Sequence, residues 1–215
     1  MRWLKEKQYH VCIPDGVSPT SGSGKIVLTF DDGEMNNYEQ AFGVLKKYGF
    51  PAYFFIIADR IGLNGYLGWG ELKELHEAGM VIGSHGFSHE ILTNLLDTQI
   101  DEELQASKKY LERNLGIVVD TISIPRGFCD DNIIQRAYNA GYKRIFISER
   151  PHNLQSDCHS RIAVKSSWSL KRFQQALDGN TPLNERVVHR GKNAVKRMFG
   201  GGAYNWVRRV LLKFK

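Results

Sequence analysis

The sequence predicts an α/β fold built on a parallel sheet. Short apolar, β-prone runs alternate about five or six times with segments whose apolar residues recur at helical spacing. Glycines close most of the helical segments. One strand and one helix together take about 25–30 residues, a length typical of a strand–helix–strand unit with a right-handed crossover. A doubly wound sheet and a (β/α) barrel both fit this alternation.

The expected strands lie in residues 25–30, 52–57, 80–82, 121–124, 144–147 and 161–164. The expected helices lie in residues 37–48, 69–78, 97–115, 131–140 and 170–177. The longest helix carries an apolar stripe made of Ile100, Leu104, Leu111 and Leu115, and Gly116 is placed to end it. No Pro- or Gly-rich linker divides residues 1–180, so we expect one domain there and a separate tail over residues 181–215.

The composition excludes several classes of protein. With 42% hydrophobic and 24% charged residues, the chain is not expected to be disordered or fibrous. No apolar run is long enough to span a bilayer, and the first residues lack the apolar stretch of a secretory signal, so we expect a cytoplasmic protein. The three cysteines form no CxxC pair, which argues against a disulfide framework and a thiolate zinc site.

The basic character of the chain is concentrated in its tail. Residues 181–215 hold nine Lys/Arg and one acid, a net charge of +8, whereas the other 180 residues hold twenty Lys/Arg and twenty-two acids, a net charge of −2. The nearly neutral body argues against nucleic-acid binding. Residues 185–198 and 204–215 could form two helices, the second amphipathic and basic around Trp206.

Such a helix is typical of an anionic membrane surface, which would place the protein on the inner face of the membrane. Two alternatives stay open for the tail. It could pack on the domain with solvated lysines, or it could bind RNA or a protein partner.

Polar residues that could take part in catalysis or metal binding follow three of the expected strands. Asp31 and Asp32 follow the first strand, His85 and His89 the third, and Arg126 the fourth. The carboxyl ends of parallel strands meet on one face of the fold, where α/β proteins build their sites. Neighbouring residues that leave a strand point to opposite sides, so one aspartate could bind a metal while the other acts as a base. The alternative is a simple turn, because Asp-Asp-Gly is also common in turns.

The two histidines have the spacing of a metal site. His85 and His89 would share a face if the segment between them made one helical turn. Two imidazoles and one carboxylate are ligands that zinc accepts, with a fourth position left open for water. The alternative is a pair of capping or surface histidines.

These motifs together resemble the NodB-homology polysaccharide deacetylases. Residues 28–33 (LTFDDG) match the family's TFDDG motif, residues 51–55 (PAYFF) its following P-A-T-F-F strand, and residues 82–89 (IGSHGFSH) its G-x-H-(S/T)-x-x-H motif. Residues 125–128 (PRGF), followed by 140–142 (AGY), resemble a divergent form of the third motif region. The similarity covers about residues 8–178.

The resemblance implies a distorted (β/α) barrel and one divalent metal, usually Zn²⁺. Carried over by position, Asp32, His85 and His89 would be the metal ligands and Asp31 the general base. Arg126 stands where the family's third motif has Tyr and not where it has Arg, but it could still reach Asp31 and keep it ionised. The alternative is a surface arginine at the end of a strand. The implied reaction removes an N-acetyl group from an amino sugar in a poly- or oligosaccharide or a lipid-linked glycan.

Besides this third motif, the sequence departs from the family pattern at two further places. Gly86 stands where the second motif has Ser or Thr, and the loss of that hydroxyl is expected to weaken local order. The family's late Leu-His, whose histidine serves as general acid, has no counterpart after residues 161–164. His152 and His159 lie just upstream as weak substitutes.

Two other functions stay open. A phosphoesterase could use the aspartates and histidines to hold two metals, although the sequence offers few further ligands. A family member that binds glycan with little or no turnover would explain the missing histidine.

If the tail binds anionic membranes, deletion of residues 199–215 should release the protein from vesicles that contain anionic lipids, because the deletion removes the second, Trp-containing basic helix. Co-sedimentation with vesicles measures the effect. Unchanged sedimentation of the shortened protein would contradict the membrane role.

Overall fold

The computed structural model describes residues 1–14, 25–148 and 158–179. The chain divides into two compact units, Met1–His159 and Ser160–Lys215, which are described separately. The predicted tail over residues 181–215, with its two helices, lies outside the described residues, and so does His152. Among the described residues, no helix combines the length and the apolar character needed to cross a bilayer.

The first unit is built on a sheet whose strands follow one another in chain order, β3-β4-β5-β6-β7-β8. The strands from β3 to β7 pair in parallel. Because parallel crossovers share one hand, consecutive order places the connecting helices on one face. The strands are β3 (Thr29–Phe30), β4 (Tyr53–Ile56), β5 (Val81–Ser84), β6 (Thr121–Ser123), β7 (Arg144–Ile147) and β8 (Cys158–Ser160).

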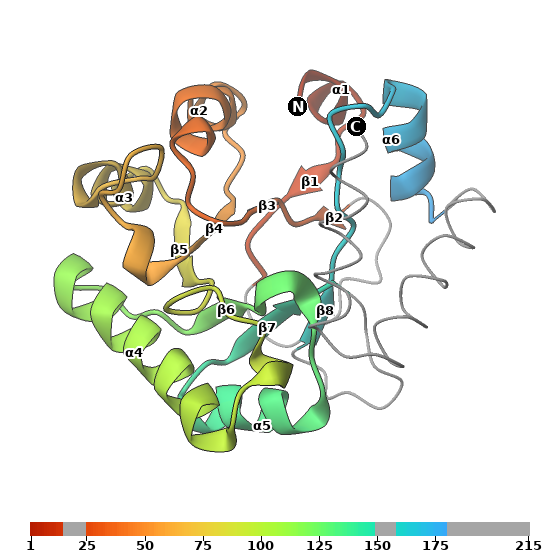
Figure 1. Ribbon diagram of the computed structural model, residues 1–215. Helices are drawn as coiled ribbons and strands as arrows, with labels where there is room; N and C mark the ends of the chain where they lie inside the picture. The colour runs from red at the N-terminus through yellow and green to blue at the C-terminus, as the bar shows by residue number, and fades with distance from the viewer. Residues whose placement is uncertain (15–24, 149–157, 180–215) are drawn as a thin grey trace, which may run out of the picture. The chain divides into compact units, whose positions relative to one another are not determined.

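The sheet curls into a half-barrel with helices on its outer side (Figure 1). A doubly wound sheet would show a reversal of strand order, and this sheet shows none. Among the described strands, none joins β3 to β8, so the arc does not close. This confirms the distorted (β/α) barrel and excludes the doubly wound alternative.

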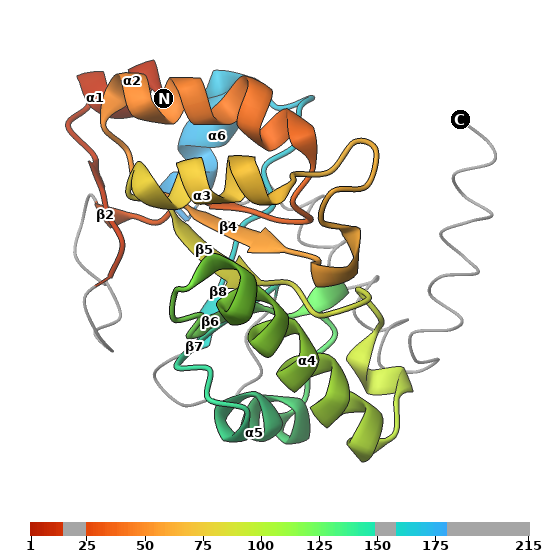
Figure 2. The same ribbon diagram turned by 90° about the vertical axis from the view of Figure 1, so that its left-hand side faces the viewer.

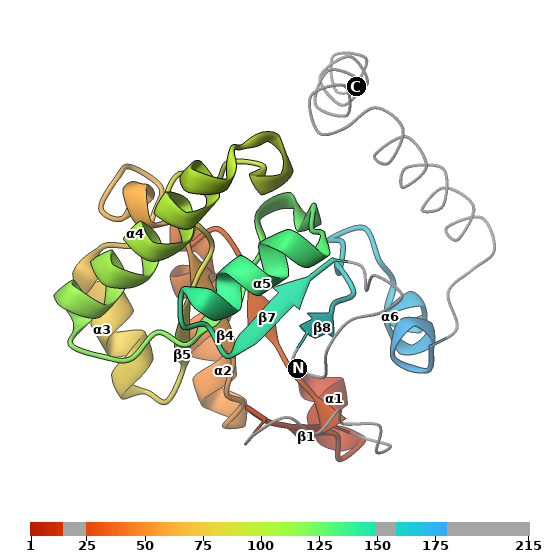
Figure 3. The ribbon, with the colours of Figure 1, turned by 90° about the horizontal axis from the view of Figure 1, so that it is seen from below.

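The helices run around the outside of the arc in chain order. Figure 2 shows α2 and α3 covering β4 and β5 from the same side. Seen from below, α3, α4 and α5 follow one another around the strands (Figure 3). Successive helices also contact each other, α3 with α4 and α4 with α5. The bounds are α2 (Gly43–Tyr48), α3 (Trp69–Glu77), α4 (Asp97–Leu115) and α5 (Asp131–Asn139).

Local sequence explains where these helices begin and end. The Asp130 carboxylate accepts a hydrogen bond of 2.9 Å from the Ile133 amide and so caps α5. Gly49 and Gly116 close α2 and α4 in the left-handed conformation, with φ of 64° and 70°. In α4, Ile100, Leu104 and Leu111 are buried as the apolar stripe predicted. The sequence therefore specifies the limits and the inward faces of these helices.

The core of the half-barrel lies on its central strands. All four residues of β4 are buried, as expected for a strand covered on both faces. An aromatic cluster forms where Tyr53 and Phe55 stack along β4 and both contact Phe146 of β7, with ring centroids 5.0 Å away. This packing joins β4 to β7, which lie three strands apart in the sheet.

Three predicted elements differ from the structure. The run 25–30 is divided between β2 (Lys25–Ile26), which pairs in parallel with β1 (His10–Val11), and β3. The helix predicted over 37–48 begins with a π-helical segment, Asn37–Phe42. Residues 161–164 form no strand, and the late strand is β8, Cys158–Ser160. For the run 25–30, apolar character marked the region, but the pairing of β2 with β1 and of β3 with β4 decided the limits of the strands.

Two further α-helices lie near the ends of the described residues, and short 3-10 helices lie at Ala58–Arg60, Leu92–Asn94 and Pro125–Gly127. Helix α1 (Arg2–Glu6) precedes β1 and was not predicted. In the second unit, α6 (Leu170–Leu177) forms as predicted, capped by the Ser169 hydroxyl, which accepts from the Arg172 amide. The Arg172 guanidinium lies over the Trp168 ring, 4.2 Å from its centroid.

Gly83 in β5 is required by close packing. A Cβ atom at this position would lie 2.6 Å from the Phe55 ring and from Thr121 Oγ1. We expect Gly83→Ala to lower the free energy of unfolding by about 1–3 kcal/mol through overpacking. Gly70→Ala in α3 is the matched control, since a Cβ there meets nothing within 4 Å. Urea unfolding of both variants checks the difference, and equal stabilities would contradict it.

Candidate metal centre

The carboxyl ends of β3, β5 and β6 bring the predicted residues together. Asp31 and Asp32 directly follow β3, and His85 directly follows β5. Ser123 is the last residue of β6. The ends of these three strands therefore lie at one place in the structure, where the Asp31, Asp32 and His85 side chains come together.

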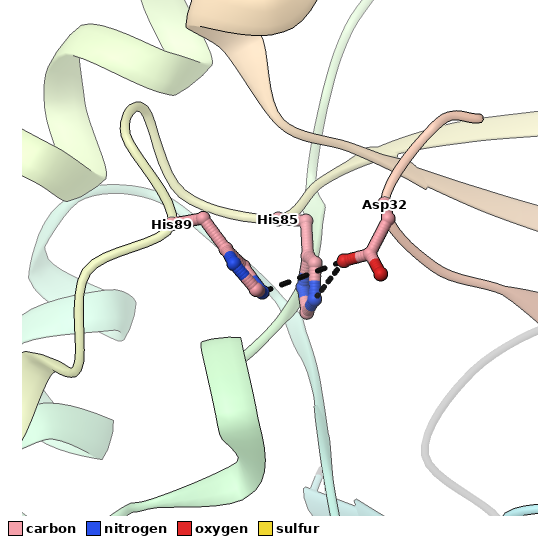
Figure 4. A group of neighbouring side chains, drawn as sticks. All are labelled: Asp32, His85 and His89. Atoms are coloured by element: carbon pink, nitrogen blue, oxygen red, sulfur yellow. Dashed lines mark ion pairs between the residues drawn. The ribbon is translucent and has the colours of Figure 1, made fainter. Parts of the chain in front are cut away.

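Asp32 faces both histidines (Figure 4). Its Oδ1 atom lies 3.4 Å from Nε2 of His85 and 3.4 Å from Nε2 of His89. The three ligand atoms all lie within 4.8 Å of one another. The imidazoles are nearly buried, with side chains 3% and 6% exposed, whereas the Asp32 side chain is 42% exposed. The two imidazoles of this group are therefore shielded from solvent, whereas its carboxylate is accessible to it.

This donor set fits a divalent metal ion. Two imidazole nitrogens and one carboxylate oxygen are ligands of zinc sites that keep a position open. The His85 ring is held in a fixed orientation, because its Nδ1 lies 2.7 Å from the Ser123 carbonyl oxygen. A carbonyl oxygen only accepts, so Nδ1 carries a proton and Nε2 is the nitrogen that faces Asp32.

The second histidine is held in its neutral form. The pKa of His89 is lowered from 6.5 to about 3, chiefly because burial disfavours the charged ring. Electrostatic repulsion from His85, Arg126 and Arg60 is part of this shift, and the negative charge of Asp31 opposes it. At neutral pH the His89 ring is therefore uncharged and has a lone pair available for a metal.

The segment between the histidines is a loop, and the predicted helical turn is wrong. Gly86 and His89 have positive φ values of 80° and 66°, which break helical geometry. The loop is bound to the segment after β4, where the amides of Ala58 and Asp59 donate to the carbonyl oxygens of Gly86 and Phe87 at 3.2 and 3.0 Å. These bonds turn the chain back so that the two imidazoles meet.

Asp31 lies beside the same imidazole as Asp32. Its Oδ2 atom is 3.8 Å from His85 Nε2 and accepts a hydrogen bond of 3.4 Å from the Ser123 hydroxyl. The expectation that the two acids point to opposite sides is wrong, because β3 ends at Phe30 and Asp32 has a φ of 71°. The strand alternation therefore no longer applies, and both carboxylates approach one site.

Comparison with known proteins agrees with this geometry. Residues 18–145 match the family described as polysaccharide deacetylase. The chain belongs to this family. The matched stretch includes β3, β5, β6 and every residue of the Asp32, His85 and His89 group.

Two curated family members illustrate the similarity. The chain is 32% identical over 124 residues to the peptidoglycan-N-acetylglucosamine deacetylase of Bacillus cereus, covering 57% of this chain and 56% of that protein. It is 30% identical over 136 residues to the poly-beta-1,6-N-acetyl-D-glucosamine N-deacetylase of Staphylococcus aureus, covering 57% and 47%. The chain spans about half the length of the curated relatives it matches.

Solved structures of the family share the architecture. A polysaccharide deacetylase from Bacillus cereus superposes with a TM-score of 0.72 at 25% identity, over 82% of this chain and 59% of that one. The Streptococcus pyogenes deacetylase PplD, solved in complex with acetate, gives a TM-score of 0.63 at 26% identity and covers 68% of each chain.

Arg126 lies at the end of β6, in the turn Pro125–Gly127. It is exposed and has a φ of 58°. Its charge reaches the site, because it contributes to the lowered pKa of His89. Its contact with Asp31 stays a prediction.

His159, one substitute for the family's late histidine, lies in β8. Its ring packs on Phe146, with centroids 5.2 Å apart. The late strand, after which the family's Leu-His motif is expected, therefore lies before the predicted residues 161–164. His159 is part of this strand. Its role as an acid stays a prediction.

Sequence reasoning missed the residues that hold the ligands in place. The Ser123 carbonyl orients His85, but a backbone oxygen has no signature in a sequence. Arg60 acts on the pKa of His89 from the turn after β4. Its position after the PAYFF strand was the one available signal.

The lowered pKa of His89 predicts a pH dependence for the metal-free protein. The unfolded chain binds a proton at His89 near pH 6.5, and the folded chain binds it only near pH 3. Stability should therefore fall as the pH falls through this range. Urea unfolding of the metal-free protein between pH 7 and pH 4 measures the effect. A His89→Asn variant should lose less stability over the same range, and equal losses would contradict the shift.

Proposed function

We propose that this protein is a metal-dependent N-deacetylase that removes an N-acetyl group from an amino sugar in a poly- or oligosaccharide or a lipid-linked glycan. The approach of Asp32 to two buried imidazoles, with Asp31 beside them, is the observation that carries the proposal. Family membership supports it, since relatives are named as deacetylases of N-acetylglucosamine in peptidoglycan and in poly-beta-1,6-linked polymer.

Asp32, His85 and His89 would hold the metal ion, with Zn²⁺ the best match to two imidazoles and a carboxylate. Cobalt or nickel could bind the same ligands. A bound divalent ion supplies Lewis acidity, which polarises the amide carbonyl and lowers the pKa of water. The open side at Asp32 is where substrate and water would enter, because that side chain is 42% exposed.

Asp31 is the proposed general base. It takes a proton from the water molecule whose oxygen attacks the acetyl carbonyl carbon. The Ser123 hydroxyl holds the Asp31 carboxylate in place. The carbon–nitrogen bond then breaks, the acetyl carbon keeps the water oxygen, and the leaving nitrogen gains a proton.

Two alternatives differ from this proposal in metal content and turnover. The described residues contain one group of three metal-ligating side chains, which supports a single ion and disfavours a two-metal phosphoesterase. A glycan-binding member with little turnover is favoured only by the missing late histidine.

The test separates metal binding from catalysis. We expect the purified protein to bind about one equivalent of zinc by elemental analysis and to release acetate from N-acetylglucosamine oligomers. His85→Ala and His89→Ala should abolish both properties. Asp31→Asn should keep the zinc and slow acetate release by roughly 10²–10⁴-fold, the usual contribution of a general base. Circular dichroism checks that each variant is folded.

Zinc bound to the wild-type protein without acetate release from oligomers or lipid-linked amino sugars would favour the glycan-binding alternative. Two equivalents of metal with activity on phosphoesters would favour the phosphoesterase. Loss of zinc in Asp31→Asn would contradict the division of roles between the two aspartates.

A further inference from the structure

One carboxylate outside the metal group binds the loop between the two histidines. Glu103 lies on α4, and its Oε2 atom accepts hydrogen bonds from the amides of Phe87 and Ser88 at 2.9 and 3.0 Å. Its Oε1 atom accepts from the Ser88 hydroxyl at 2.5 Å. Three donors of one short loop therefore converge on a single side chain.

These bonds act directly beside a metal ligand. Ser88 precedes His89, so fixing its amide and its hydroxyl fixes the start of the backbone that carries the imidazole. A charged acceptor makes shorter and stronger hydrogen bonds than a neutral one. The position of His89 thus depends on a residue fourteen positions further along the chain.

The same helix also binds the other end of the loop. The Ser84 hydroxyl accepts from the Gly86 amide at 3.1 Å and donates to the Ser107 hydroxyl at 2.9 Å. Ser107 lies four residues after Glu103 on α4, so the two side chains share a face of the helix. Helix α4 therefore anchors the loop on both sides of its turn.

This arrangement explains how the loop tolerates Gly86. The hydroxyl that was expected to order this segment is absent, yet the space beside Gly86 is filled by Glu103, whose Oε2 atom would lie 3.5 Å from a Cβ at this position. Pro125 Cγ would lie 3.2 Å from the same Cβ. The bonds to Glu103, to Ser84 and to the segment after β4 therefore order the loop without a hydroxyl at residue 86.

We propose that Glu103 is a positioning residue of the metal centre, which sets the geometry of His89 through the Phe87 and Ser88 amides. The inference rests on the proposed function, because it assigns Glu103 a task only if Asp32, His85 and His89 bind a metal. Groups that orient metal ligands commonly change metal affinity by about 10–100-fold when they are removed.

The test measures zinc affinity by competition with a chromophoric chelator, using the full chain. Glu103→Ala should weaken zinc binding by about 10–100-fold. Glu103→Gln should recover most of this affinity, since the amide oxygen can accept both backbone bonds and the amide nitrogen can donate to Ser88 Oγ. Glu102→Ala, at the exposed neighbouring residue, should bind zinc like the wild type.

Thermal unfolding of the metal-free variants provides the second readout. A Glu103→Ala protein that unfolds like the wild type yet binds zinc weakly supports the positioning role. Wild-type zinc affinity in Glu103→Ala would overturn it, as would a Glu103→Gln variant as weak as Glu103→Ala. Failure of the wild-type protein to bind zinc would instead contradict the proposed function itself.

Discussion

Asp32 Oδ1 lies 3.4 Å from the Nε2 atoms of both His85 and His89. The other features of the site depend on this close arrangement of one carboxylate and two imidazoles. Two buried rings and a carboxylate that stays partly in water form a group with one side open to solvent. Imidazole nitrogens in low-dielectric surroundings are suited to bind a cation, which would replace the favourable interactions with water that burial removes.

The groups around these three residues hold the two histidines in position. A backbone carbonyl fixes the tautomer of His85, and burial keeps His89 uncharged. The carboxylate of Glu103 holds the loop that brings the second ring back toward the first. Each support comes from a different element, namely β6, the loop itself and α4. The precision of the site is therefore a property of the packed half-barrel, and the motif residues alone do not provide it.

The sequence predicted the alternating architecture, most helix limits and the identity of the converging residues. Residues that follow apolar strands in a parallel sheet meet by topology, so Asp31, Asp32 and His85 could be placed together without coordinates. The path between His85 and His89 could not be predicted, because their spacing also fits a helical turn. The positive φ values that decide the matter depend on hydrogen bonds to distant residues. The role of Glu103 could not be predicted either, because α4 carries several acids and only tertiary packing decides which of them contacts the loop.

The consecutive order of the strands has a consequence for how the site is assembled during synthesis. Each of the strands from β4 to β7 pairs with its immediate predecessor in the chain, so the sheet can grow one strand at a time as the chain leaves the ribosome. Asp32 follows β3, and His85 and His89 follow β5, so all three ligands precede α4 and β6 in the chain. We expect the nascent chain to bring these ligands together early. Helix α4 and β6 then arrive to lock the two rings, before β7 is made.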